Sequence, residues 1–558
     1  MINPFWVVLH SATGRMLNCS AVLDTTKPIL LVDGWLEDNT NLFDKLTRGV
    51  LTDPSGDAAV LAHNPQTFFT LALRDRFGVH SIYYAKDAEN LHISSSISGL
   101  KHSGLRLRPD QAKNCIFVAS HYRYFTFPKN STFFTGVSCL MPGEYLMVAT
   151  GIIKTGSFTD LELADMSRQS EQEISEEFLH RLNRSVRARL ALVKRPAFTL
   201  SSGMDSSTVA CLASRVIGPP TLITTTFDDP TEYDESSEVS KTAQAIGGEW
   251  LQMKISQDEL SIMLSKSESG SDEPCATITQ MMHRVVAERA RDLGHDALFS
   301  GLGGDEASCG EIEEYLYYFA DLRYLGMEER LLGDLVGWAK YHGTAEFPKN
   351  LTILENFFLS EIDFTVPGRV LLNNSRFYSN FDALSEDMTR ADIPCPQLPN
   401  PFTSYLLNKL YQDLFFETIP IVLKAETHNA RLTGVPTLYP FLERGVMMHG
   451  FSTPLTMRYK DGTTKPIIRA ATKGIVPDTA RNNFYKRGWN APVDKWLRHQ
   501  LTGIVEDLLN DRQLQQRGVY NISVIRRKLN EHLSGQKNHM QLFWQFINYE
   551  RWYRAATE

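Results

Sequence analysis

The chain has 558 residues, with 57 Lys and Arg against 65 Asp and Glu, so its formal net charge is −8 at pH 7. At roughly 150 residues per domain there is room for about two to four domains, and the acidic balance excludes nucleic acid as a partner, because a phosphate backbone needs a basic surface. The N-terminus lacks the pattern of a signal peptide, and no apolar run approaches the roughly 18 residues of a membrane helix, so we expect a soluble protein without membrane insertion.

Seven cysteines are scattered along the chain without a CxxC pair or Cys/His ligand spacing. This pattern argues against a structural zinc and against a disulfide framework, and it is typical of the reducing cytoplasm. We therefore expect a cytoplasmic protein whose cysteines are small, mostly buried apolar residues.

The first 150 residues are β-rich. Residues 67–85 read as two strands separated by a charged turn, LHISSSI alternates apolar and polar residues, and a Pro-Gly turn separates two more strand-like runs in STFFTGVSCLMPGEYLMV. This pattern predicts antiparallel sheet.

From Gly156 to Glu173 the chain becomes polar and charged, which predicts an interdomain linker. Ser170 and Glu173 have the spacing of a capping box, and apolar residues then recur on one helical face from Ile174 to Leu190. We expect a second domain to begin near residue 170.

The second domain alternates short apolar strands with helical segments of 10 to 15 residues, from the strand AFTLS through TLITTTF and WLQMKI to ALFSGL. This alternation predicts βαβ units and a parallel sheet, and ligands bind at the carboxyl ends of such strands. After Gly310 the pattern is mainly helical. The predicted fold class is therefore α/β, with an antiparallel-sheet domain before a parallel-sheet domain and a long helical region.

The loop SSGMDSS, residues 201–207, leaves the first strand of this sheet. Its backbone N–H groups and Ser hydroxyls at the start of a helix suit a phosphate or pyrophosphate. Asp205 is expected there only if it holds a divalent cation that also binds the phosphates. Ser and Asp are also ordinary helix caps, so the loop alone leaves both interpretations open.

A second loop, SGLGGDE (residues 300–306), follows another apolar strand. Its glycines permit close approach of a ligand to the backbone, and Asp305 supplies a second carboxylate for a Mg²⁺ shared with Asp205. Two such loops at the same sheet edge are harder to explain as caps.

Two further segments carry candidate cations. Lys465 precedes a helix and can stabilise charge during acyl transfer, and Lys486 and Arg487 precede a Gly. Taken alone, the pattern at Lys465 favours a solvated surface residue over a catalytic one. The aromatic run LFWQFINYERWY is typical of a buried core helix, and the acids at 232, 234, 235 and 238 are typical of a solvated helix start.

These motifs together resemble the asparagine synthetase family, whose synthetase domain carries the loop SGGxDS. Here it stands as SSGMDS, with Ser202 in place of a glycine, and YDES, DEP, SGLGGDE, YPFLER, Lys465 and YKRGW follow in order. RDRFGVHSIYYA and LMPGEYL look like the family's glutaminase domain. The resemblance implies an Ntn-hydrolase-like αββα domain at 1–165, degenerate in this chain, and an ATP-pyrophosphatase-type synthetase domain at 166–558.

The resemblance also implies that a carboxylate is adenylated by ATP and then attacked by an amine. Mg²⁺ would be bound by Asp205 and Asp305, and Lys465, Ser300 and Gly301 would act at the reacting centre. The residues implied to hold the nucleotide are Leu200, Ser201, Ser202, Gly203, Asp205, Ser206, Phe227, Gly303 and Lys486.

Departures from the family pattern narrow the expectation. Ile2 stands where the family's glutaminase has its nucleophilic Cys, Leu302 replaces the Glu or Tyr of the resembled synthetases, and Pro436 stands in a Glu position. A leucine transfers no proton. Lasso peptide cyclases depart in the same way, which implies a macrolactam formed between the N-terminal amine and an Asp or Glu side chain of a precursor peptide, with a leader peptidase and a leader-recognition protein as possible partners.

Two alternatives stay open at this point. One is an ammonia-dependent asparagine synthetase or another small-molecule amide or β-lactam-type synthetase. The other is a catalytically dead scaffold, which the presence of Asp205, Asp305 and Lys465 disfavours.

Overall fold

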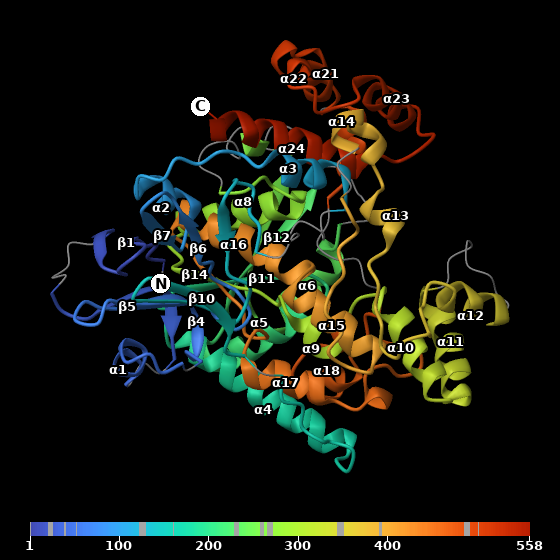
Figure 1. Ribbon diagram of the computed structural model, residues 1–558. Coiled ribbons are helices and arrows are strands. Elements are labelled where there is room, and N and C mark those ends of the chain that lie inside the picture. Colours follow the sequence, from blue (N-terminus) through green and yellow to red (C-terminus); the bar gives the residue numbers. More distant parts are fainter. Residues whose placement is uncertain are drawn as a thin grey trace.

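The computed structural model (Figure 1) describes most of the chain. The described residues are 2–20, 26–37, 41–51, 53–121, 130–159, 161–227, 234–256, 260, 262–264, 272–342, 351–389, 393–484, 491–499 and 501–557.

Two antiparallel five-stranded sheets form the N-terminal part. The first has the order β2-β1-β7-β6-β8 and the second has the order β10-β9-β5-β4-β3. Their strands are β1 (Trp6–His10), β2 (Met16–Cys19), β3 (Ile29–Leu36), β4 (Gly56–Asn64), β5 (Phe69–Leu73), β6 (Tyr83–Lys86), β7 (Asn90–Ser94), β8 (Val137–Cys139), β9 (Glu144–Ala149) and β10 (Ile152–Ser157).

The two sheets pack face to face. One apolar cluster combines Val7 and Ile93 of the first sheet with Leu61 and Leu146 of the second. Helix α1 (Leu42–Thr47) covers the outer face of the second sheet, and α2 (Ile97–His102) and α3 (Gln111–Ala119) belong to the other side. The layers agree with the predicted αββα arrangement.

The second part contains a parallel sheet with the order β13-β12-β11-β14-β15. Its strands are β11 (Pro196–Thr199), β12 (Thr221–Phe227), β13 (Glu249–Ile255), β14 (Ala297–Phe299) and β15 (Thr437–Leu438). All four neighbouring pairs are parallel, which confirms the sheet predicted from the alternating pattern. The sequence gives no sign of β15, because two residues carry no periodicity.

The first helix of this part begins where the sequence predicts. Helix α4 (Glu171–Leu190) starts with the expected capping box of Ser170 and Glu173, and its apolar face from Ile174 to Leu190 is buried. The helices α5 (Met204–Ile217), α6 (Ser236–Ala245) and α8 (Ile278–Asp292) connect the strands.

Helices dominate the remainder of the chain, as predicted after Gly310. They are α9 (Gly304–Ser308), α10 (Glu314–Tyr324), α11 (Glu328–His342), α12 (Leu351–Leu359), α13 (Asn374–Phe377), α14 (Glu386–Thr389), α15 (Tyr405–Phe415), α16 (Thr418–Thr433), α17 (Arg444–Ser452), α18 (Pro466–Ala471), α19 (Asp478–Arg481), α20 (Val493–Arg498), α21 (Thr502–Asn510), α22 (Arg512–Gln516), α23 (Ile522–Leu533) and α24 (Met540–Thr557), with short 3₁₀ turns at Phe381–Ala383 and Leu455–Met457.

Helix α24 holds the aromatic run LFWQFINYERWY, and most of its side chains are buried, which confirms their expected place in the core. It lies beside α3 of the N-terminal part (Figure 1). The side-chain amide of Gln545 donates to the backbone carbonyls of Phe117 and Ser120 at 2.6 and 3.0 Å. These hydrogen bonds join the C-terminal helix to the end of α3.

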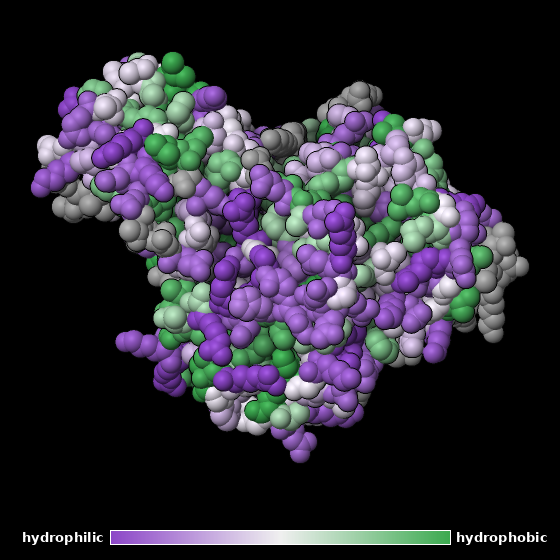
Figure 2. All heavy atoms as spheres, turned by 90° about the horizontal axis from the view of Figure 1, so that it is seen from below, coloured by the Kyte–Doolittle hydropathy of each residue, from purple (hydrophilic) through white to green (hydrophobic). Residues whose placement is uncertain are grey.

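The face of the molecule in Figure 2 is mainly hydrophilic, and the cysteines are free, as the sequence predicts. Figure 2 shows a mainly hydrophilic face on which hydrophobic residues form separate areas. All seven cysteines are free, four of them buried and three half-buried. Within the described part of the chain, no helix has the combined length and apolar character that crossing a bilayer requires.

Candidate functional site

The candidate site lies at the carboxyl ends of β11 and β14, which are neighbours in the parallel sheet. After β11 the chain turns at residues 200–203 and enters α5, whose first turn carries Asp205. Ser201 and Ser206 close this turn, since their hydroxyls lie 2.9 Å apart and the Ser201 N–H donates to Ser206 Oγ at 3.1 Å. The two hydroxyls thus lie together at the N-terminus of α5, the place where the sequence predicts an anion site.

The second loop packs directly on the first because it is rich in glycine. A Cβ atom at Gly301 would lie 2.6 Å from the backbone nitrogen of Ser206, and one at Gly304 would collide with the carboxyl group of Asp205. Gly303 has φ +90°, a conformation that residues with a side chain rarely adopt. Glycine is therefore required for the two loops to meet.

Lys465 bridges the two carboxylates of the site. Its Nζ lies 2.6 Å from Asp305 Oδ1 and also contacts Asp205 Oδ2. The side chain is only 4 % exposed, so the solvated-surface interpretation of Lys465 is wrong. Gly310 makes room for this contact, because a Cβ there would collide with Asp305 and Lys465.

The backbone at Lys465 is strained. This residue is the N-cap of α18 and has φ +60°, a left-handed conformation that costs non-glycine residues about 1–3 kcal/mol. Such strain persists only where the surroundings enforce it, and here it directs the amine between Asp205 and Asp305. The structure thus brings together three residues that are 260 positions apart at most.

Arg469 lies one turn further along α18 and extends the positive charge. Its guanidinium donates to the carbonyls of Thr464 at 2.8 Å and Asn483 at 3.0 Å and contacts the carbonyl of Arg481. Burial lowers the pKa of this group to about 10, against the opposing charge of Asp205. Arg469 therefore remains a cation at neutral pH. Its contacts with the carbonyls of Arg481 and Asn483 hold that segment against α18.

Sequence reasoning missed the role of Glu235, which it assigned to a solvated helix start. The side chain is buried, and its two carboxylate oxygens accept from the N–H of Ser202 at 3.0 Å and from the Ser202 hydroxyl at 2.9 Å. The one signal for this pairing is that Ser202 departs from the family glycine.

Acidic groups behind the site are unusually crowded. Burial, together with the nearby charge of Asp305, raises the pKa of Glu306 well above its ordinary value. Burial, with the same charge adding to it, does so for Glu314, whose carboxylate accepts from the Tyr459 hydroxyl at 3.1 Å. Both groups therefore ionise less readily than ordinary carboxyl groups, and the carboxylates that contact Lys465 are those of Asp205 and Asp305.

The remaining predicted residues lie around these loops. Leu200 is buried directly after β11, with its N–H donating to the carbonyl of Ile223 at 3.1 Å. Phe227 ends β12, is buried and packs edge-on against Trp496. Ser300 Oγ accepts from the N–H of Leu302 at 3.2 Å. Gly203 is exposed at the start of α5, and Lys486 lies outside the described residues.

The donor set fits ATP and Mg²⁺ as ligands. No cluster of three or more His, Cys, Asp or Glu side chains suited to a metal occurs in the described ranges, so the protein offers two carboxylates. Mg²⁺ typically binds through one or two carboxylates and the oxygens of substrate phosphates. A Cβ at Gly203 would meet only Ser201 Oγ, at 3.3 Å, which leaves open space beside the loop.

The structure also describes Leu302 and Pro436, two residues of the second part at which the chain departs from the family pattern. Leu302 is partly buried against the apolar core, and the carbonyl of Pro436 accepts from the N–H of Leu298 at 2.9 Å. Neither side chain titrates, so neither exchanges a proton with a nucleophile.

Comparisons with known proteins identify the family of the two parts. A family model described as asparagine synthase matches residues 177–554, and one described as a glutamine amidotransferase domain matches residues 40–159. The asparagine synthetase [glutamine-hydrolyzing] 1 of Bacillus subtilis is 24% identical over 513 residues, which cover 90% of this chain and 78% of that protein.

Two fungal proteins are also similar. The amidase chry2 of Gibberella zeae is 28% identical over 254 residues, covering 42% of this chain and 37% of that protein. The amidase chyE of Penicillium rubens is 26% identical over 273 residues, covering 46% and 40%. The matched part thus spans about two fifths of the length of these two relatives.

Proposed function

This chain belongs to the asparagine synthase family, and we propose that it is an ATP-dependent amide ligase that adenylates a carboxylate and joins it to an amine of its own substrate. The reaction releases pyrophosphate on activation and AMP when the amine attacks, so that one amide forms and one water is lost from the two joined groups. The observation that carries the proposal is the meeting of Asp205, Asp305 and Lys465 beside the Ser201–Ser206 turn.

Each group has a defined task in this reaction. The Ser201 and Ser206 hydroxyls and the N–H groups at the start of α5 bind the polyphosphate. Leu200 and Phe227, at the ends of β11 and β12, form apolar contacts with the nucleoside. Asp205 and Asp305 would hold Mg²⁺, which would supply charge neutralisation at the phosphates.

Lys465 contributes charge at the reacting carbon. Its amine already lies between the two carboxylates and is almost fully shielded from water. A cation in such a shielded place stabilises a developing oxyanion more strongly than one in water. Ser300 and Gly301, which adjoin the Ser206 backbone, place the carboxylate to be activated against the nucleotide.

The cysteines of the N-terminal part support an amine that does not come from glutamine. Burial raises the pKa of the Cys115 thiol to about 12, which leaves it protonated and a poor nucleophile. The buried Cys139 thiol donates to the carbonyl of Leu140 at 3.4 Å. Cys19 lies on β2, at the edge of its sheet. The Cys115 thiol is therefore unsuited to the role of a glutaminase nucleophile.

In its finer form the proposal is a lasso peptide cyclase. The substrate is then a precursor core peptide whose Asp or Glu side chain is adenylated and whose N-terminal amine closes a macrolactam. Holding both groups in one pocket makes the attack intramolecular, which supplies the advantage of proximity. A leader peptidase and a leader-recognition protein are the partners that this form of the proposal requires.

Mass spectrometry after incubation with ATP and Mg²⁺ tests this function. One arm contains leader-free peptides with a free N-terminus and an internal Asp or Glu, and the other contains free aspartate with ammonium. A peptide that loses one water while AMP forms supports the cyclase. Turnover of aspartate with ammonium and of no peptide contradicts the cyclase and favours an asparagine synthetase, and AMP formation in neither arm contradicts the ligase.

A further inference from the structure

A cavity of about 310 Å³ lies between the N-terminal sheets and the second part of the chain. Tyr83 and Phe133 line it from the N-terminal side, and the DEP segment, α8 and α16 line it from the other. This volume is in the range of pockets that bind small organic groups. The cavity is separate from the Asp205 site, and the mechanism above does not use it.

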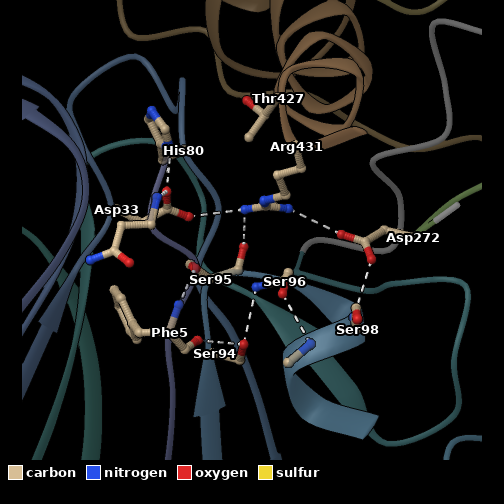
Figure 3. A network of polar contacts seen from close by, with 12 residues as sticks. Phe5, Asp33, His80, Ser94, Ser95, Ser96, Ser98, Asp272, Thr427 and Arg431 are labelled. Carbon is tan, nitrogen blue, oxygen red and sulfur yellow. Dashed lines mark hydrogen bonds and ion pairs between the residues drawn. The ribbon is translucent and has the colours of Figure 1, made fainter. Parts of the chain in front are cut away.

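An ionic network forms one wall of the cavity (Figure 3). Arg431 of α16 donates to Asp33 at 3.2 Å, to Asp272 at 3.2 Å and to the carbonyl of Ser95 at 2.6 Å. Asp272 in turn accepts from the N–H of Ser98 at 3.2 Å. Arg431 thus ties β3 and the start of α2 to the DEP segment, and its charge is matched.

The other charged groups of the wall are also paired. Lys424 Nζ lies 2.9 Å from Glu273 Oε1, and Arg284 Nε lies 3.2 Å from Glu288 Oε1. Both acids of the DEP motif therefore turn toward α16. A charged ligand would have to break one of these largely buried pairs, and an ion left uncompensated in such a place costs several kcal/mol.

Apolar side chains make up much of the remaining wall. Phe133, Met263, Met281 and Ile421 line the cavity and are buried. Methionine is flexible and polarizable, so it adapts to apolar groups of different shape. Thr427, whose hydroxyl donates to the carbonyl of Val79 at 2.6 Å, and Asn429 add polar atoms at the edge.

The cavity shares an apolar cluster with the carboxyl end of β12. Met263, Met281 and Ile421 belong to the same apolar cluster as Phe227, the residue that ends β12. Helix α16 also reaches the sheet itself, because the hydroxyl of Thr437 on β15 donates to Glu426 at 3.1 Å. A ligand bound at the sheet edge and one bound in the cavity are thus in contact with one continuous apolar core.

We propose that this cavity binds an uncharged, mainly apolar side chain of the ligase's own substrate, such as an aromatic or a long aliphatic group. That the occupant is part of the substrate rests on the proposed function. That the occupant is uncharged and apolar is inferred from the residues that line the cavity. The three ion pairs fix the shape of the pocket, while Phe133 and the two methionines contact the bound group.

Calorimetric titration of the full chain with indole tests the chemistry of the pocket, with indoleacetate as the charged counterpart. Indole should bind at one site, and indoleacetate at least tenfold more weakly. Ala425→Phe places an aromatic ring in the cavity from α16 and should weaken indole at least tenfold. Ala339→Phe, at a half-buried alanine of α11 outside the cavity, should leave indole binding unchanged. Ala425→Leu, a smaller change, covers a failure of Ala425→Phe to fold and should give a weaker effect of the same sign.

Competition and kinetics then test the occupant. A substrate found in the mass-spectrometric assay should displace indole, and replacing its apolar residue by Asp should raise KM at least tenfold with little change in kcat. Absence of indole binding, or equal binding in Ala425→Phe, overturns the pocket. A substrate that leaves indole bound overturns the occupant, even if indole itself binds.

These outcomes are separate from those of the ligase proposal. AMP formation with intact kinetics in Ala425→Phe contradicts only the pocket. Failure of AMP formation with every substrate contradicts the proposed function and with it the named occupant, while the indole titration still decides whether the cavity takes uncharged apolar groups.

Discussion

Lys465 and Arg431 each lie between two carboxylates, but the surroundings of the two cations differ. Lys465 lies between Asp205 and Asp305 at the edge of the parallel sheet, and Arg431 lies between Asp33 and Asp272 at the contact of the two parts. Glycines 301, 304 and 310 surround the first place. At the second, helix α16 carries the cation, and the Ser95 carbonyl takes a further hydrogen bond.

The difference separates a structural clamp from an exchangeable site. Arg431 uses its rigid fork to satisfy three acceptors at once, which an ammonium group cannot copy. Lys465 is a point charge on a flexible stem, at a strained loop position, and a cation with phosphate oxygens can replace its contacts. Under the proposed function, the same charge pattern serves stability in one place and chemistry in the other.

The largest expected effect is on the Lys465 site. Asp205→Asn and Asp305→Asn should each lower AMP formation by at least about 1000-fold, since each removes one of the two carboxylates that can hold the metal. Pyrophosphate release measures this, with urea unfolding as a check on stability. Asp292→Asn, at an exposed acid paired with Arg291, should behave as the wild type. Full activity in either site variant would mean that the metal is bound elsewhere.

Arg431→Met should lower the stability of the protein without affecting ATP binding. It leaves Asp33 fully buried without its guanidinium partner, and removing one partner of a buried pair costs about 3–5 kcal/mol. Urea unfolding should show this loss, while the KM for ATP of the remaining folded protein stays within about twofold. As a control, Arg291→Met at an exposed pair should cost less than about 1 kcal/mol. A loss of ATP affinity at unchanged stability would contradict the assigned structural role.

The sequence predicts the elements better than it predicts these two places. Periodicity and capping residues locate α4, β12 and the two loops at the sheet edge, because those signals are local. Burial of Lys465 is not predicted, since it depends on Gly310 and on packing between segments far apart. The bond between Ser202 and Glu235 and the network of Arg431 are missed for the same reason, because their partners come together only in the folded chain.

The hydrogen bonds between Ser202 and Glu235 are expected to stabilise the turn at residues 201–206. Glu235→Ala removes the acceptor of both the N–H and the hydroxyl of Ser202, and hydrogen bonds to a charged group contribute about 1.5–3 kcal/mol. The Kd for ATP should rise about tenfold, as measured by calorimetry. Ser202→Gly keeps the backbone bond and should give a rise of about threefold. Glu238→Ala on the same helix serves as the control. Unchanged affinity in Glu235→Ala would show that the turn needs no such support.

The smallest expected effect is the pH dependence of the clamp. Burial alone raises the pKa of Asp33, but the nearby His80, whose Nδ1 lies 3.6 Å from Asp33 Oδ1, and the charge of Arg431 together hold this pKa well below its ordinary value of 3.8. The folded state then binds fewer protons than the unfolded state, so this stabilisation is present above about pH 4 and is lost as the pH falls. Urea unfolding between pH 3 and pH 7 should show a flatter acid slope in Asp33→Asn than in the wild type. Equal slopes would contradict the assigned ion pair.

The most direct measurement of the central claim follows heavy oxygen from the substrate carboxylate. A pool of peptides with free N-termini and labelled Asp and Glu side chains, with labelled free aspartate and ammonium in a parallel reaction, is incubated with the full chain, ATP and Mg²⁺. Attack of the carboxylate on the phosphate next to the nucleoside, followed by amide formation, leaves one labelled oxygen on AMP. The account predicts labelled AMP and unlabelled pyrophosphate in the peptide reaction. Labelled inorganic phosphate with ADP, or no labelled nucleotide in either reaction, would contradict it.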